Sequence, residues 1–162
     1  PDKSAIYPDE FRYQIHETKE SLPMEGTHRP GHFTGMLTVV MKLFQLIKPT
    51  RAYFGEKDYQ QLTLVQGMID AFFMNIELRA CPIVRDTNGL ALSSRNSRLS
   101  DAGYKTACQF ARIFHETPAV DQIQPALEAK GIIVEYIETH QNRRFAAVQI
   151  EGVCLIDNYV LL

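Results

Sequence analysis

The chain has 162 residues, of which 45% are hydrophobic and 22% charged, and its formal net charge is −2. This is the composition of one globular domain or of two small ones, and it lacks the excess of lysine and arginine that a nucleic-acid partner requires. Lys42 and Gln45 interrupt the longest apolar stretch, so the sequence predicts no membrane span.

The first thirty residues predict strand and loop. Residues 5–7 are apolar and end at Pro8, as at the end of a strand. Residues 11–16 alternate apolar and polar side chains, which indicates a half-buried strand. Residues 17–29 are polar and interrupted by proline and glycine, which is typical of a loop.

Residues 33–84 predict the order helix, strand, helix, strand. A helix is expected over 33–48, because its apolar side chains recur at helical spacing and Pro49 follows. A short strand over 51–54, a polar turn, a helix to about Phe73 and a strand over 76–84 come next. This alternation is typical of a parallel sheet with crossover helices.

From Ser100 onward the pattern changes to helices followed by hairpins. Ser100 is the expected cap of a helix, and a shorter helix over 121–130 ends at Gly131. Strands are expected over 132–139, 145–150 and 153–161, the last two joined by a two-residue turn. The sequence thus predicts a small α+β unit with an antiparallel sheet, separated from the first by a boundary near residues 84–97.

The first candidate site is the strand–loop–helix transition at residues 53–62. Gly55 allows close approach of a ligand, and Lys57 places a cation beside a helix start, where anions are favoured. Asp58 can cap the helix or bind a hydroxyl, and Gln60 and Gln61 add amide groups. Such a turn resembles a nucleotide site at the carboxyl end of a parallel sheet, although ordinary strand–helix turns carry the same residue types.

Two other polar clusters follow from the sequence. Ser93, Ser94 and Arg95, followed by Asn96, suit phosphate oxygens, and the alternative is a capped loop end that satisfies its own backbone. His28 and His32 flank a proline and lack a third ligand, so no metal site is predicted, and Arg29 beside them is interpreted as available to an anion.

The remaining reactive side chains are interpreted as structural. Glu135, Glu138 and Asp157 fall on predicted strands and are expected on solvated faces. Cys81 is expected in the core. The three cysteines, Cys81, Cys108 and Cys154, are odd in number and widely spaced, which favours a reducing cytoplasm over a disulfide framework.

Three motifs in this order resemble the pantoate–β-alanine ligase family. They are Arg-Pro-Gly-His-Phe at 29–33, Phe-Gly-Glu-Lys-Asp-Tyr-Gln-Gln at 54–61 and Gly-Leu-Ala-Leu-Ser-Ser-Arg-Asn at 89–96, and Leu-Ile-Asp-Asn at 155–158 closes the chain. The resemblance covers nearly all of the chain. It implies an α/β fold of the nucleotidyltransferases related to class I aminoacyl-tRNA synthetases. Residues 1–84 would form the C-terminal part of a Rossmann-like domain that binds ATP and pantoate, and 85–162 a lid domain.

The resemblance also implies an activity. Members of the family use ATP and Mg²⁺, the metal being carried by the nucleotide phosphates, to adenylate pantoate with release of pyrophosphate. The amine of β-alanine then displaces AMP to give pantothenate. Such enzymes are cytoplasmic homodimers, and the resemblance implies neither a nucleic-acid partner nor a membrane.

Site residues carry over from the matching motifs. Gly55 and Asp58 would meet the ribose, Lys57 the phosphates and Gln61 the pantoate, while the backbone of Val84 would contact adenine. Leu92, Ser93, Ser94 and Arg95 would form a second phosphate loop. The full implied ATP set is Gly55, Glu56, Lys57, Asp58, Val84, Leu92, Ser93, Ser94 and Arg95, of which Lys57, Ser93, Ser94 and Arg95 would be catalytic.

One departure from the family pattern is large. The family's His-x-Gly-His motif is absent, because His28 and His32 align with its Arg-Pro-Gly-His loop instead. Roughly 90 residues, about three βα units, would be missing ahead of Pro1. We therefore expect a C-terminal portion of the enzyme that is inactive alone. The alternatives are a non-catalytic nucleotide-binding or dimerisation module, or a nucleotidyltransferase that acts on a different hydroxy acid.

Overall fold

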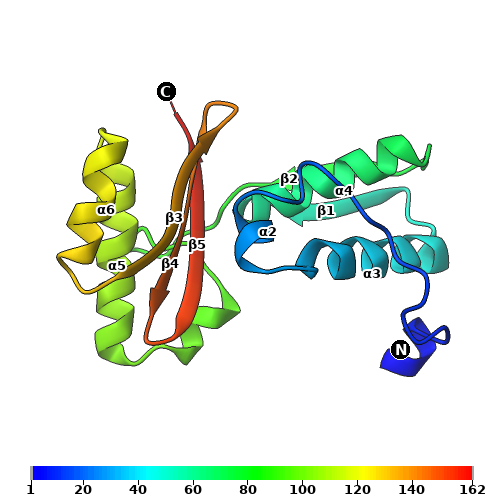
Figure 1. Cartoon of the computed structure of the whole chain (residues 1–162), viewed down its shortest axis with the longest axis horizontal. Helices are drawn as coiled ribbons and strands as arrows, with labels where there is room; N and C mark the ends of the chain where they lie inside the picture. The colour runs from blue at the N-terminus through cyan, green and yellow to red at the C-terminus, as the bar shows by residue number, and fades with distance from the viewer. Residues whose placement is uncertain (1, 162) are drawn as a thin grey trace. The chain divides into compact units, whose positions relative to one another are not determined.

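The computed structural model describes residues 2–161 (Figure 1). The chain divides into two compact units, residues 1–81 and residues 82–162. They are called unit 1 and unit 2 below. Within the described residues, no helix has the length and apolar character that a membrane span requires.

Unit 1 is built around one parallel strand pair. Strands β1 and β2 pair in parallel, with Arg51 opposite Glu77 and Gly55 opposite Cys81, and α4 is the crossover between them. The predicted helix–strand–helix–strand order is therefore confirmed. The elements are α1 (Lys3–Ile6), α2 (Glu25–His28), α3 (His32–Ile47), β1 (Arg51–Gly55), the 3₁₀ turn η1 (Glu56–Asp58), α4 (Tyr59–Ala71) and β2 (Glu77–Cys81).

The core of unit 1 lies between its two long helices and one face of the strand pair. Ala52, Phe54 and Leu78 pack against this core, whereas the alternate residue Tyr53 is 67% exposed on the other face. The buried side chains from α3 and α4 are Phe33, Leu37, Phe44, Leu64, Val65, Met68 and Ile69. This packing places the end of β1 and the start of α4 at one edge of the core (Figure 1).

Two predictions near the N-terminus are wrong. Residues 5–7 do not continue a strand: Ile6 ends α1, and the Asp2 carboxylate accepts the Ala5 N–H at 3.0 Å, as a helix cap does. Residues 11–16 form no strand, because side chains take their backbone donors. The N–H of Tyr13 donates to Asp9 at 3.1 Å, and that of Ile15 donates to Thr38 Oγ1 at 2.9 Å.

The strand predicted over 76–84 is shorter than expected. It ends at Cys81, which pairs with Gly55, the last residue of β1. Pro82 follows and has no backbone N–H to continue the ladder. Cys81 is half-buried, and all three cysteines are free thiols.

Unit 2 is a three-stranded antiparallel sheet in the order β3-β4-β5. Both connections are two-residue turns, Gln141-Asn142 and Glu151-Gly152, with positive φ at each position, as in type I′ hairpins. The predicted α+β character is confirmed. The elements are η2 (Ser94–Arg98), α5 (Asp101–Glu116), α6 (Val120–Glu128), β3 (Ile133–His140), β4 (Arg143–Ile150) and β5 (Val153–Val160).

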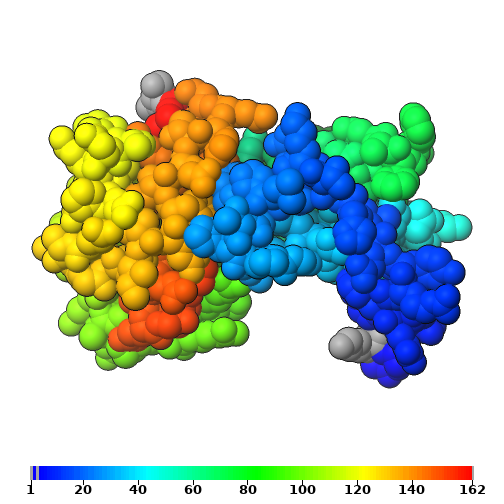
Figure 2. All heavy atoms as spheres, viewed as in Figure 1, coloured from blue at the N-terminus to red at the C-terminus, as the bar shows by residue number. Residues whose placement is uncertain are grey.

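Both helices of unit 2 lie on the same side of this sheet (Figure 1). The space-filling view shows the atoms of α6 directly against those of β3 (Figure 2). Phe110 and Phe114 of α5 are stacked with their ring centroids 5.7 Å apart, inside a core that includes Val148 of the central strand. The other buried side chains are Leu90, Ala107, Ala111, Ile123, Leu127, Ile132, Ala146, Ile150, Val153 and Leu155.

The start of α5 is clamped from the hairpin between β4 and β5. Ser100 Oγ accepts the Gly103 N–H at 3.1 Å, which confirms the predicted cap, and donates to the Glu151 carboxylate at 2.6 Å. The same carboxylate accepts the Ser100 N–H at 2.9 Å. A Cβ at Gly103 would lie 2.4 Å from Glu151 Oε2, so only glycine leaves room for this contact.

Candidate functional site

The loop after β1 presents an open backbone. Gly55 has φ −73° and ψ 133°, a conformation open to any residue, and a Cβ built there would meet nothing within 4 Å. Neither strain nor packing therefore explains the glycine. The bare backbone instead leaves space for close approach of a bound molecule.

Lys57 and Asp58 place a charge pair at the start of α4. The side chain of Lys57 is 19% exposed, and its Nζ lies 3.9 Å from Asp58 Oδ1. Asp58 occupies the N-cap position without a side-chain hydrogen bond to the helix, so the expected cap is not formed. Its carboxylate is 51% exposed and accessible to a hydroxyl donor.

The two glutamines of α4 have different surroundings. Gln60 is buried, and its Nε2 donates to the carbonyls of Glu20 and Pro23, both at 2.9 Å, so it holds the preceding loop in place. The half-buried side chain of Gln61 makes no hydrogen bond to any residue in the described range 2–161. Gln61 is therefore the glutamine whose amide is available to a ligand.

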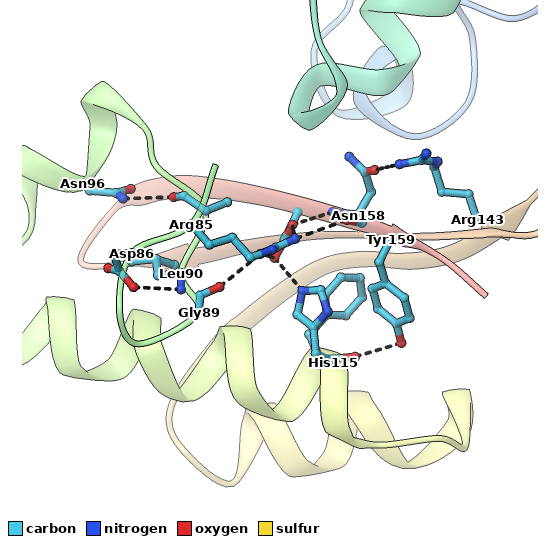
Figure 3. Close-up of polar contacts among 12 residues, drawn as sticks. Arg85, Asp86, Gly89, Leu90, Asn96, His115, Arg143, Asn158 and Tyr159 are labelled. Atoms are coloured by element: carbon cyan, nitrogen blue, oxygen red, sulfur yellow. Dashed lines mark hydrogen bonds and ion pairs between the residues drawn. The ribbon is translucent and has the colours of Figure 1, made fainter. Parts of the chain in front are cut away.

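The second candidate loop forms a tight hairpin in unit 2. The N–H of Leu92 donates to the carbonyl of Val84 at 2.9 Å, inside an isolated antiparallel bridge between Arg85 and Ala91. Asp86 Oδ1 accepts the N–H of Leu90 at 3.0 Å and closes the turn (Figure 3). The side chains of Val84 and Leu92 are exposed, so this hairpin presents an apolar surface to solvent.

Beyond the hairpin, residues 93–96 combine local capping with exposed donors. Ser93 Oγ accepts the Arg95 N–H at 3.2 Å, which is the capped loop end expected as the alternative interpretation. Arg95 Nη1 donates to the carbonyl of Cys154 at 3.0 Å, and Asn96 Nδ2 to that of Ala91 at 3.1 Å. Ser94 is exposed. The cap uses the Ser93 hydroxyl as an acceptor only, so the O–H groups and the guanidinium still suit an anion.

The sequence interpretation of Asp157 is wrong. Its side chain is 1% exposed and accepts from Arg85 Nη1 at 2.7 Å and Nη2 at 2.8 Å. His115 Nε2 lies 3.0 Å from the same carboxylate (Figure 3). A sequence signal existed, because Asp157 is in phase with the buried Val153 and Leu155 along β5.

Burial and hydrogen bonding act on Asp157 in opposite directions. Burial raises the pKa of its carboxyl group, but the hydrogen bonds from His115 and Arg85 outweigh this, and the pKa lies below its ordinary value. Asp157 therefore carries its charge in the folded protein. An ionised carboxylate only accepts hydrogen bonds, so the Nε2 of His115 carries the proton between them.

The other polar candidates have local partners. Glu138 pairs with His140 at 2.7 Å, and Glu135 Oε1 accepts from Gln149 Nε2 at 2.7 Å. Arg29, expected to be available to an anion, contacts the Glu25 carboxylate and His32 Nε2, both at 3.2 Å. The contact to Glu25 is the i,i+4 pair of a short helix, where the sequence pattern predicted a loop.

The structure thus gathers the predicted site residues into two groups. Gly55, Glu56, Lys57, Asp58 and Gln61 lie together at the end of β1 in unit 1. Val84 and residues 92–95 lie together in the hairpin of unit 2. Their roles toward a ligand stay predictions.

Comparison with curated proteins identifies close relatives. The chain is 58% identical over 161 residues to the pantothenate synthetase of Legionella pneumophila and 53% identical over 159 residues to that of Coxiella burnetii. These matches cover 99% and 98% of the chain but only 64% and 61% of the relatives. They fall in the C-terminal portion of those proteins.

Solved structures agree with this result. The pantoate-β-alanine ligase from Francisella tularensis, complexed with beta-gamma ATP and β-alanine, matches with a TM-score of 0.93 and 38% identity over 99% of the chain and 62% of its own length. The pantothenate synthetase of Thermus thermophilus matches with a TM-score of 0.85 and 33% identity over 99% of this chain and 67% of its own length. These matches confirm the predicted fold class. Because the family model for pantoate-β-alanine ligase also matches residues 1–160, the chain belongs to that family.

Proposed function

We propose that this chain supplies the nucleotide-binding loops of an enzyme that condenses pantoate with β-alanine, using ATP, through a pantoyl-adenylate intermediate. The observation that carries the proposal is the pair of loops at 55–61 and 92–95, which present cations and hydroxyls in a member of this ligase family. The Francisella relative, crystallised with beta-gamma ATP and β-alanine, supports the choice of substrates. The chain spans 64% of the Legionella relative, so the activity is proposed for the complete protein.

In the first step, a carboxylate oxygen of pantoate attacks the α-phosphorus of ATP and the bond to pyrophosphate breaks. Negative charge builds on the leaving pyrophosphate. Lys57 and Arg95 neutralise this charge, and the hydroxyls of Ser93 and Ser94 donate hydrogen bonds to phosphate oxygens. In the second step, the amine of β-alanine attacks the acyl carbon and AMP leaves, which yields pantothenate.

The remaining contacts orient the reactants. The exposed carboxylate of Asp58 and the bare backbone of Gly55 suit the ribose hydroxyls. Glu56 follows Gly55 on η1, and we place it in the same part of the ATP site. Gln61, whose side chain makes no hydrogen bond to a residue in the range 2–161, is assigned to pantoate. The backbone of Val84 is assigned to adenine.

Mg²⁺ fits this site as a companion of the nucleotide. The side chains assigned to the phosphates are cations and hydroxyls, whereas Mg²⁺ prefers carboxylates, phosphates and water. The metal would neutralise phosphate charge when bound, and its ligands would come mainly from the triphosphate. A homodimer in the cytoplasm, with no nucleic-acid partner, completes the proposal on the basis of the family resemblance.

Pantoate-dependent exchange between ATP and labelled pyrophosphate tests the first step directly. The assay is run on this chain and on a hybrid. In the hybrid, the part of the Legionella pneumophila relative that this chain does not match precedes Pro1. We expect exchange in the hybrid, and pantothenate formation once β-alanine is added.

The variant Lys57→Ala sharpens this test. Loss of a charge contact to the leaving group is expected to lower the adenylation rate by about 100-fold. Lys19→Ala is the matched control, because Lys19 belongs to the same unit and its side chain is 86% exposed. An undiminished rate in Lys57→Ala would refute the role of Lys57. ATP binding without exchange in the hybrid would instead favour the non-catalytic nucleotide-binding module.

A further inference from the structure

The hairpin and loop over residues 84–96 carry five of the predicted ATP-binding residues but little regular structure. Only the isolated bridge between Arg85 and Ala91 and the short η2 turn belong to this segment. Surface segments of this kind are usually mobile. A binding loop that must hold a nucleotide in one geometry needs a rigid attachment, and two side chains of the loop provide it.

Arg85 is the first attachment. Its guanidinium binds both oxygens of Asp157 on β5, at 2.7 and 2.8 Å, in the bidentate geometry that fixes direction as well as distance. The same guanidinium donates back to the carbonyl of Gly89 at 3.1 Å, inside the hairpin (Figure 3). Arg85 thereby fixes the turn of the hairpin. Because it directly follows Val84 in the chain, it also restrains the backbone of Val84.

Arg95 is the second attachment. Its Nη1 donates to the carbonyl of Cys154, three residues before Asp157 on the same strand. The two ends of the segment therefore both bind β5, which is paired along its whole length with the central strand β4. Leu92 and the residues up to Arg95 lie between these two attachment points.

Asp157 is itself held in one orientation. Its carboxylate accepts from Arg85 and from His115 Nε2, and Oδ1 also accepts the Asn158 N–H at 2.8 Å. His115 lies at the end of α5, so the carboxylate joins the helix, the sheet and the hairpin. A buried carboxylate with its lone pairs occupied in this way has little freedom to turn.

We propose that Asp157, oriented by His115, is a positioning residue for ATP: through Arg85 it sets the backbone of Val84 and of residues 92–95. The inference rests on the proposed function, to which it adds Asp157, His115 and Arg85. The side chain of Asp157 is 1% exposed, so in this proposal it acts through Arg85 and not by direct contact with a substrate. Displacement of the loop by about 1 Å is enough to lower reaction efficiency by up to about 100-fold.

The test uses Arg85→Lys in the hybrid described above. Lysine keeps the positive charge but loses the planar fork and therefore the simultaneous contacts to Asp157 and Gly89. We expect KM for ATP to rise on the order of 10-fold or more. KM for pantoate should stay within about twofold, because Gln61 is on α4 of unit 1, outside this network. Rates are measured below the melting transition of each variant.

Two further variants separate positioning from a purely structural role. Asp157→Asn keeps the shape of the side chain but removes its charge, and is expected to reproduce the rise in KM for ATP. Glu138→Gln is the matched control, because Glu138 also pairs with a histidine on the same sheet, at 2.7 Å, but does not touch the loop. A purely structural role would lower the active fraction, and thus kcat, without changing KM.

Hydrogen exchange on the 162-residue chain gives a readout independent of activity. In Arg85→Lys, the Leu92 and Leu90 amides, which are bonded inside the hairpin, should exchange on the order of 10-fold faster, while those of β4 stay unchanged. Unchanged exchange in the hairpin, or unchanged KM for ATP in both variants, would overturn the inference. An inactive wild-type hybrid would overturn the proposed function and this inference with it, and it would be recognised before any variant is made.

Discussion

The two candidate loops are positioned in different ways. The loop at 55–61 continues a strand directly into a helix, so the register of β1 and the start of α4 set its backbone. The segment at 84–96 belongs to no long element, and side chains hold it to β5 instead. A site residue on a strand–helix turn thus needs little support, whereas one on an irregular segment depends on buried partners far along the sequence.

The hydrophobic cores of the two units also differ in how completely they are shielded from solvent. Unit 2 closes three strands against two helices, and its central strand is almost entirely buried. Unit 1 has two strands, and Tyr53 on its uncovered face is 67% exposed. Past the end of α4, Phe73 is 94% exposed. Unit 2 should therefore resist unfolding more strongly than unit 1.

The largest expected effect comes from the core of unit 2. Phe114→Ala removes a fully buried ring and should lower the free energy of unfolding of this unit by about 3–5 kcal/mol. Phe73→Ala in unit 1 is the control and should change stability by less than about 0.5 kcal/mol. Urea denaturation followed by hydrogen exchange measures both. Equal effects would contradict the picture of one closed and one open core.

A smaller effect is expected on acidification. Folding lowers the pKa of Asp157 below its ordinary value of 3.8, so its contribution to stability is complete above that value and is lost as pH falls through the lower folded pKa. The stability difference between the wild type and Asp157→Asn should therefore narrow below about pH 4, by at most about 1.4 kcal/mol per pH unit. Urea titrations at several pH values measure it. A difference that stays constant to about pH 2 would show that the carboxylate is not held in this way.

The smallest expected effect concerns the cap of α5. Ser100→Ala removes the hydroxyl that accepts the Gly103 N–H and should destabilise unit 2 by about 1 kcal/mol. Ser97→Ala, whose hydroxyl only donates to the exposed Ser94 carbonyl, is the control and should be near neutral. Thermal unfolding of both variants decides the point. If Ser97→Ala cost as much, capping would not be the reason.

The regular elements were predictable because they depend on local signals. A few neighbouring residues were enough to predict each of three features: the apolar stripe of α3, the Ser100 cap and the Glu151-Gly152 turn. The alternation at 11–16 failed, since a strand needs a partner and none of the described strands pairs with it. The two anion loops were proposed from local signals of the same kind, and their role toward an anion stays a prediction. Asp157 was missed because its partners, Arg85 and His115, are 72 and 42 residues away.

The Glu151 clamp has a consequence for the order of folding. The hairpin tip between β4 and β5 binds the first turn of α5, 51 residues earlier in the chain. The tip therefore completes its native contacts only when α5 has begun to form. Substitutions at Ser100 and Glu151 are expected to give similar φ-values in folding kinetics, because one nucleation event forms both ends of the contact. The turn itself is local in sequence, but its contact with α5 is long-range. Long-range contacts form slowly, so this contact is expected to slow the closing of the sheet.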